Sequence, residues 1–368
     1  MLELLQHLVN LEWRRRGALI RQLPVAGSRV WYAEFQPDSR PVEKSAAVAG
    51  ARVGPRRALP GGAGAAFAPG YSVRRGSPAA VAPGREPQAG RTKPPTVVLL
   101  HGLGASSASF HSVIPRLRKI YRVVVPDLPG YGLSRPPPGR EFLPFTELVE
   151  VAEKFVARVA PRGAYLAGNS MGGWIAAKVA ARRPALVRGM ALLNPGGPAL
   201  RAKDWVDFAR IILAEERGVM DEWLRRMFHR PPLLMRLFTH DFHRIVRGPS
   251  VSQLMTSLRA EDFLSEEEMK LVRCPAVLVW GERDRLLPDG CRTFYLKKLK
   301  GIRYEPIPDC GHCPQLECPS RTAEILLDLS NVAAKGAVPA STGGGGATTP
   351  LPSLRRGGLK AVARAPKP

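Results

Sequence analysis

Residues 166–177 read LAGNSMGGWIAA and place a single serine, Ser170, among glycines. An apolar run comes before this serine, and a run of small residues with helical character follows it. Residues 168–172 fit the pattern Gly-x-Ser-x-Gly, in which glycine permits a tight bend and close approaches that other residues prevent. Between a strand and a helix, the pattern lifts the serine hydroxyl out of the sheet and points the first helical amides at it. We therefore expect Ser170 to be a nucleophile at a strand–helix turn.

Short apolar runs recur on either side of this stretch, and helical patterns separate them. Each run has the length of a strand buried on both faces of a sheet, and the runs are 96–100, 121–125, 164–167, 189–193, 276–280 and 302–307. The clearest helical pattern covers 148–159, with Thr146 as its expected cap. This alternation predicts a mostly parallel central sheet flanked by helices. Residues 20–35, with Gly27 at a turn, predict a hairpin that leads the sheet.

The interval 199–271 breaks the alternation, because it contains helical patterns and no convincing strand. It predicts a helical insertion before the penultimate strand. Its aromatic and methionine side chains face either the body of the protein or a substrate, and core packing is the favoured interpretation for most of them. The residues concerned include Trp205, Phe208, Met220, Trp223 and Met227.

A serine hydroxyl is a poor nucleophile without a base, and the base needs an acid to orient it. In the predicted architecture these groups follow the serine in the order acid then histidine, in loops at the carboxyl ends of later strands. Asp284 follows the predicted strand 276–280, and His312 follows the predicted strand 302–307. We predict that Asp284 is the acid and His312 the base.

Three other carboxylates lie in the same two loops. Glu282 and Asp289 are weaker candidates for the acid, and Asp309 is expected to be a turn residue because it lies too close to His312 in sequence.

Acyl transfer also needs donors for the oxyanion of the tetrahedral intermediate. One donor is expected to be the backbone amide of Met171, which follows the nucleophile. The sequence His-Gly-Leu-Gly at 101–104 comes directly after a predicted strand, and we assign the second donor to the amide of Leu103.

With these motifs the chain resembles the α/β-hydrolase superfamily of serine hydrolases. The segments LLHGLGASSASF, VVVPDLPGYGLS, GNSMGG, LLNPGG, WGERDRLLP and CGHCPQLECP look like its signatures and occur in the family order. The likeness covers residues 17–331 apart from an insertion at 39–95. It implies an α/β-hydrolase fold with a helical cap, a Ser-His-Asp triad and no cofactor. A serine nucleophile argues against the dehalogenase and epoxide hydrolase branches.

Two branches of the superfamily are similar to this chain: monoacylglycerol-lipase-like esterases and hydrolases that cleave C–C bonds in aromatic ring-fission products. The loop HGLGASS favours the first, since the second usually has a Gly-Pro-Gly version and a Trp after the histidine, where this chain has Cys313. The resemblance implies hydrolysis of a carboxylic ester with a hydrophobic acyl chain. C–C bond hydrolysis and a non-catalytic binding protein of the same fold are the alternatives.

The formal charge of +24 over 368 residues raises the question of a nucleic-acid partner. Ten basic and three acidic residues lie between Asp38 and Pro95, and six basic and no acidic residues follow Ser330. The excess is thus concentrated in two tracts rich in Ala, Gly and Pro, which are expected to be disordered. We expect no specific nucleic-acid binding.

These observations predict six segments: an N-terminal helix and leading strands (1–38), a disordered insertion (39–95), the first part of the core (96–198), the cap (199–271), the second part of the core (272–331) and a disordered basic tail (332–368). The five cysteines are expected to be reduced thiols of a cytoplasmic protein, since no signal peptide is recognisable. Cys310, Cys313 and Cys318 lack the second ligand pair of a zinc site, so no metal is expected.

The N-terminal segment carries an apolar stripe at helical spacing, followed by Arg14, Arg15 and Arg16. Such a helix is expected to pack on its own domain, and contact with a membrane surface is the alternative. The stripe consists of Leu4, Leu5, Leu8, Val9 and Leu11.

Overall fold

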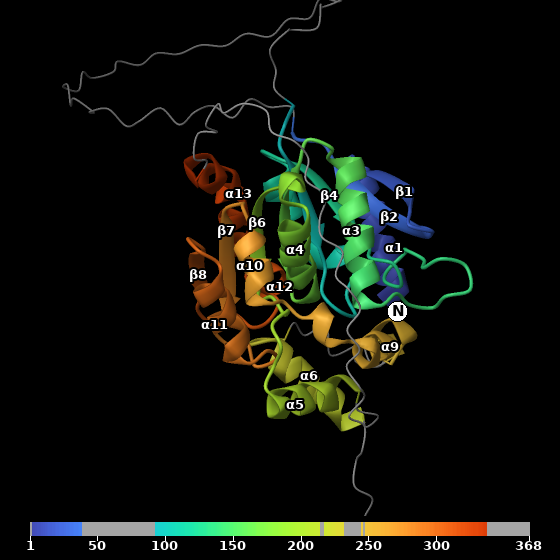
Figure 1. Ribbon diagram of the computed structural model, residues 1–368. Coiled ribbons are helices and arrows are strands. Elements are labelled where there is room, and N and C mark those ends of the chain that lie inside the picture. The colour runs from blue at the N-terminus through green and yellow to red at the C-terminus, as the bar shows by residue number, and fades with distance from the viewer. Residues whose placement is uncertain (1, 39–92, 214–216, 232–243, 246, 337–368) are drawn as a thin grey trace, which may run out of the picture.

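The computed structural model describes residues 2–38, 93–213, 217–231, 244–245 and 247–336. These residues form an eight-stranded sheet in the order β1-β2-β4-β3-β5-β6-β7-β8 (Figure 1). β1 and β2 form an antiparallel hairpin, β2 pairs antiparallel with β4, and the other strands are parallel, as predicted. The strands are β1 (Leu19–Val25), β2 (Ser28–Phe35), β3 (Thr96–Leu100), β4 (Arg122–Pro126), β5 (Ala164–Asn169), β6 (Val187–Leu193), β7 (Ala276–Gly281) and β8 (Arg303–Ile307).

The central strands form where the apolar runs lie, because both faces of the sheet are covered. Side chains alternate along a strand, so Val98 and Leu100 of β3 join one hydrophobic cluster, whereas Val97 and Leu99 join the other. All four are buried.

One face of the sheet is covered by α3, α4 and α11, and the other by α1, α2 and α13. Figure 1 shows α3 and α4 side by side in front of the sheet. The helices of the body are α1 (Leu2–Arg15), η1 (Ser107–Phe110), α2 (Ile114–Leu117), α3 (Phe145–Val159), α4 (Met171–Arg182), η2 (Pro184–Leu186), α11 (Asp289–Lys298), α12 (Pro314–Glu317) and α13 (Pro319–Gly336).

The insertion between β6 and β7 is helical in its described residues, in keeping with the helical insertion predicted there. It contains α5 (Ala202–Leu213), α6 (Arg217–Met227), α9 (Pro249–Ser257), η3 (Ala260–Asp262) and α10 (Glu266–Leu271). α5, α6 and α9 lie together beyond one end of the sheet (Figure 1). Trp223 and Met227 are buried in the core as expected, whereas Trp205 and Phe208 line a pocket. The side chain of Met220 lies outside the described residues.

The leading hairpin turns at Ala26 and Gly27, both with positive φ (47° and 78°), which is the geometry of a tight two-residue hairpin turn. The expected cap of α3 is wrong. Pro144 occupies the N-cap position, and Thr146 lies in the first turn, where its hydroxyl donates to Asp262 at 2.6 Å. That long-range partner explains why the hydroxyl does not cap its own helix.

The expected disordered segments lie almost wholly outside the described residues, which omit 39–92 and 337–368. α13 continues to Gly336, past the boundary expected at residue 331.

α1 packs on the domain through a face that includes polar side chains, and not through the whole apolar stripe that the sequence predicts. Gln6, Asn10 and Trp13 are buried, whereas Leu8 and Leu11 are 52% and 53% exposed, so the expected packing of the apolar stripe is wrong for these two leucines. The polar side chains can face inward because Gln6 bonds to Asn10 and to the hydroxyl groups of the two serines at the start of η1. No described helix has the length and apolarity needed to cross a bilayer.

Candidate active site

Ser170 lies at the turn between β5 and α4, the strand–helix context that the sequence predicts. Its backbone has φ 54° and ψ −117°, a conformation that costs energy for a residue with a side chain. The flanking glycines make the turn possible through close approach. A Cβ at Gly168 would lie 2.2 Å from the carbonyl oxygen of Gly172, and one at Gly172 would lie 2.1 Å from that of Leu100. The strand and the helix therefore hold the serine at the carboxyl edge of the sheet.

Asp284 and His312 meet as predicted, although their loops lie 28 residues apart. The distance between His312 Nδ1 and Asp284 Oδ2 is 2.8 Å, and the side chains are 3% and 0% exposed. Because an ionised carboxylate only accepts, Nδ1 carries the proton and Nε2 is left as the proton acceptor. The described residues give Nε2 no hydrogen-bond partner. Catalytic hydrogen bonds often tighten only when substrate is bound.

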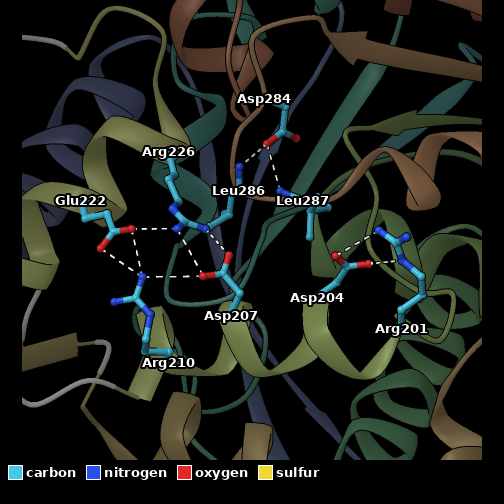
Figure 2. Close-up of polar contacts among 9 residues, drawn as sticks. All are labelled: Arg201, Asp204, Asp207, Arg210, Glu222, Arg226, Asp284, Leu286 and Leu287. Carbon is cyan, nitrogen blue, oxygen red and sulfur yellow. Dashed lines mark hydrogen bonds and ion pairs between the residues drawn. The ribbon is translucent and has the colours of Figure 1, made fainter.

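The carboxylate of Asp284 accepts four hydrogen bonds. Oδ1 accepts from the backbone amides of Leu286 and Leu287 at 2.8 and 3.1 Å (Figure 2), and Oδ2 accepts from His312 and from Asn194 Nδ2 at 2.7 Å. The acid is thereby fixed in position and in orientation.

Asn194 was not predicted as a site residue. It follows β6, is fully buried and adopts a positive φ of 42°, which asparagine tolerates better than most residues. Its Oδ1 accepts from the amide of Gly281 at 3.0 Å, so both ends of its side chain amide are used. The sequence signal was available, because a polar residue directly after a buried parallel strand lies at the same edge as Ser170.

Asn169 joins the nucleophile turn to the loop of the base. Its Nδ2 donates to the carbonyl of His312 at 2.9 Å and to that of Leu193 at 3.1 Å, and its Oδ1 accepts from Gln315 at 3.0 Å. Asn169 is the neighbour of Ser170, so these bonds hold the backbone of His312 beside the nucleophile. Sequence reasoning also missed this residue, which lies inside the quoted motif.

The predicted oxyanion donors lie at the same pocket as Ser170, which Leu103 and Met171 both line. Met171 is the first residue of α4, where amides have no partner within the helix and the helix dipole favours negative charge. The loop that carries Leu103 is fixed by His101. This ring donates from Nδ1 to the carbonyl of Gly102 at 2.8 Å and accepts from the amide of Leu128 at 2.9 Å. Burial lowers the pKa of His101, which favours the neutral ring that these two bonds require.

The pocket over Ser170 is lined almost entirely by apolar side chains. The body supplies Phe145 and Trp174 to its wall, and the cap supplies Trp205 and Phe208. Among the described residues no charged side chain lines it. The remaining lining residues are Leu103, Met171, Gly196, Gly197, Pro198, Leu200, Leu254, Met255, Leu258, Phe263, Leu287 and Cys291.

The weaker carboxylate candidates are exposed, unlike Asp284. Glu282 is exposed, Asp289 begins α11 with 64% of its side chain exposed, and Asp309 adopts a positive φ of 52°, as expected for a turn residue. The cysteines of this loop are free thiols, and burial raises the pKa of Cys310 and of Cys313. In the part of the chain that the structure describes, no group of three or more His, Cys, Asp or Glu side chains can hold a metal ion.

Known proteins are similar to this chain in sequence and in structure. The hydrolase YugF of Bacillus subtilis, itself uncharacterised, is 30% identical over 247 residues, 64% of this chain and 89% of that protein. A pimeloyl-acyl-carrier-protein methyl ester esterase of Yersinia enterocolitica is 27% identical over 250 residues, 64% of this chain and 92% of the relative. A bacterial membrane phospholipase A of known structure superposes with a TM-score of 0.66 at 25% identity, covering 90% of this chain and 91% of that one. The family model described as the alpha/beta hydrolase family matches residues 97–325. With more than half of its length matched by that model, the chain belongs to the alpha/beta hydrolase family, and it is a hydrolase.

Proposed function

We propose that the protein hydrolyses carboxylic esters that carry a hydrophobic acyl chain, through an acyl-enzyme on Ser170. The observation that carries the proposal is the buried bond between Asp284 and His312, which leaves Nε2 of the histidine as the free base. The esterase among the relatives supports ester chemistry. Asn169 supports the nearness of the base to the nucleophile, since it bonds to the backbone of His312.

In this mechanism Ser170 Oγ attacks the ester carbonyl while His312 Nε2 takes the hydroxyl proton. The new oxyanion accepts hydrogen bonds from the amides of Leu103 and Met171. Collapse of the intermediate breaks the ester C–O bond, and His312 gives its proton to the leaving alcohol. Water then attacks the acyl-enzyme by the same route and releases the carboxylic acid and free Ser170.

The lining of the pocket supports an uncharged acyl chain. Its described residues are apolar and include four of the large aromatic side chains named above, which provide contact area without a partner for a charge. A dienoate ring-fission product carries a carboxylate, and burying it without a cationic partner is costly. The lining that the structure describes therefore favours an acyl ester over the substrate of a C–C bond hydrolase.

The test uses p-nitrophenyl esters of increasing acyl length with the wild type, Ser170→Ala and the control Ser320→Ala. Ser320 is an exposed serine whose hydroxyl accepts a hydrogen bond from Arg116, the one side-chain partner given for it among the described residues. We expect turnover by the wild type and the control, and loss of about 10³-fold or more in Ser170→Ala. Equal rates in all three proteins would contradict the proposal. Turnover of a ring-fission dienoate in place of the esters would support the C–C alternative, and absence of fluorophosphonate labelling at Ser170 would support a binding protein.

We further propose that α1 contacts an anionic membrane surface. Leu8 and Leu11 face outward while Gln6 and Asn10 face the domain, so the exposed side of α1 carries two large apolar side chains next to the exposed His7. Arg14 and Arg15 lie at the end of this helix and are exposed, which supports attraction to anionic headgroups. The membrane phospholipase among the structural neighbours is in keeping with this proposal.

Sedimentation with vesicles tests the membrane proposal. We expect the protein to bind vesicles that contain phosphatidylglycerol and not pure phosphatidylcholine, and the double variant Leu8→Glu/Leu11→Glu to stay in the supernatant. Leu271→Glu on α10 is the matched control, since this leucine is 51% exposed and lies away from α1. Binding that survives the double change, or a dimer that the double change dissociates, would overturn the assignment.

A further inference from the structure

The last turn of the cap helix α6 touches the loops of both the acid and the base. The carbonyl oxygen of Arg226 accepts from the amide of Arg285 at 3.1 Å, and that of Met227 accepts from the amide of His312 at 2.7 Å. The final carbonyls of a helix have no partner within it, and here the two loops supply the donors. The cap and the catalytic loops are therefore joined through backbone atoms.

Glu317 of α12 makes a second connection between the same parts. Its Oε2 accepts from the amide of Gly311 at 2.6 Å, and its Oε1 accepts from the amide of Arg230 at 2.9 Å. One carboxylate thus holds the loop residue before His312 and the segment that follows α6. Charge-assisted bonds of this kind are about twice as strong as neutral ones.

The two segments lie too close together for a side chain at Gly311. A Cβ there would be 2.6 Å from the carbonyl oxygen of Met227, 2.6 Å from Glu317 Oε2 and 2.8 Å from the amide nitrogen of His229. This contact is independent of the hydrogen bonds and places the end of the cap helix directly against the residue before the base.

Charged side chains fix α6 to its neighbour α5 in the cap (Figure 2). Arg226 contacts Asp207 at 2.5 Å and Glu222 at 2.7 Å, and Arg210 contacts Glu222 at 3.0 Å and Asp207 at 3.6 Å. The charges alternate in sign around this group of four. The guanidinium of Arg226 is therefore fixed within the cap, while its backbone carbonyl accepts the hydrogen bond from Arg285 in the loop of Asp284.

We propose that Glu317 is a positioning residue, whose carboxylate ties the loop of His312 to the end of the cap helix and so keeps the base in place for proton transfer from Ser170. The inference rests on the proposed serine mechanism. His312 is held by Asp284 at its ring, by Asn169 at its carbonyl and by Met227 at its amide. Glu317 bonds to Gly311, the residue before His312, and to Arg230, three residues after the end of α6. Loss of this carboxylate therefore loosens both segments that flank the bond between His312 and Met227.

The experiment compares the wild type with Glu317→Gln, Glu317→Ala and the control Glu324→Gln. Glu324 lies on α13, is exposed, and pairs with Arg321 at 3.5 Å. Three quantities are measured: kcat and KM for a p-nitrophenyl ester, the rate constant for fluorophosphonate labelling of Ser170, and the thermal unfolding midpoint. Activity is expressed per labelled site, so that unfolded protein does not count.

We expect kcat per labelled site to fall about tenfold in Glu317→Gln and about a hundredfold in Glu317→Ala, with KM within about twofold, because small misplacements of a catalytic group have effects of this size. The labelling rate falls in parallel, since it uses the same base. The isosteric Gln variant keeps one acceptor and guards against a failure to fold. Glu324→Gln matches the wild type.

A lower unfolding midpoint with unchanged kcat per labelled site and an unchanged labelling rate would show a purely structural role and overturn the inference. Failure of the proposed function is a different result, visible in the wild type alone as absence of ester turnover and of Ser170 labelling. If Ser170 is labelled but the chosen ester is not turned over, the labelling rates of the variants still decide the role of Glu317.

Discussion

Replacement of Asn194 by alanine tests the support of the acid most directly. The change leaves the buried amide of Gly281 without its acceptor, and an unsatisfied buried donor costs about 1–3 kcal/mol. It also removes the hydrogen bond to the carboxylate of Asp284, and a bond of this kind is worth about 1.5–3 kcal/mol. We expect the free energy of unfolding to fall by about 3–5 kcal/mol, because Gly281 and the side chain of Asp284 are buried and water cannot replace the lost groups.

Catalysis is expected to suffer as well. Asn194 holds the same oxygen of Asp284 that receives His312, so without it the carboxylate can rotate away from the ring. If the full value of the lost bond, about 1.5–3 kcal/mol, is missing in the transition state, kcat/KM falls about 10- to 150-fold. Urea unfolding gives the stability, and hydrolysis of p-nitrophenyl butyrate, normalised to fluorophosphonate-labelled sites, gives the rate.

The control is Asn331→Ala, which removes an exposed amide bonded to Asp328 at 3.1 Å. Its unfolding free energy should stay within about 0.5 kcal/mol of the wild type. A wild-type stability and a wild-type kcat/KM for Asn194→Ala would refute the reasoning, because they would mean that neither hydrogen bond contributes.

Three further predictions concern the turn, the thiol beside the base and the pocket. Gly172→Ala places a Cβ 2.1 Å from a carbonyl oxygen of β3, so it should abolish fluorophosphonate labelling of Ser170 and lower the thermal unfolding midpoint. The control is Gly290→Ala on α11, where nothing lies within 4 Å of the new Cβ. This change should leave labelling unchanged and raise the stability in thermal unfolding by about 0.5–1 kcal/mol. Burial and two nearby carboxylates raise the pKa of Cys313, so the thiol stays protonated at pH 8; iodoacetamide at that pH should leave ester hydrolysis unchanged, and mass spectrometry should find Cys313 unmodified. Phe208→Ala enlarges the cap side of the pocket and should raise kcat/KM for dodecanoyl relative to butanoyl esters by about tenfold, the value of roughly two further buried methylene groups; an unchanged ratio would remove Phe208 from the acyl site.

The strands and the order of the proposed catalytic residues were predictable from the sequence, because both depend on local patterns. Apolar runs of strand length are visible without knowledge of their partners, and β3 coincides with its predicted range. Asp284 and His312 were found because a parallel sheet brings the ends of β7 and β8 to one edge.

The supporting residues were harder to predict, because their partners lie far away in the chain. Asn169 bonds to a carbonyl 143 residues away and Asn194 to a carboxylate 90 residues away, and no local spacing encodes either contact. Thr146 was misassigned for the same reason, since its hydroxyl bonds to a residue 116 positions away. The inward face of α1 could not be predicted, because the hydroxyl groups that allow Gln6 to be buried lie about 100 residues further along the chain.

β8 forms one edge of the sheet and is mostly half-exposed, yet the loop that follows it carries His312. An outermost strand has a neighbour on one side only, and such strands fray at lower free energies than the strands inside a sheet. Mild heat or denaturant should therefore release the imidazole while the central strands persist. Hydrolytic activity would then be lost at temperatures below the global unfolding midpoint. It would return on cooling, because the central strands would not have unfolded.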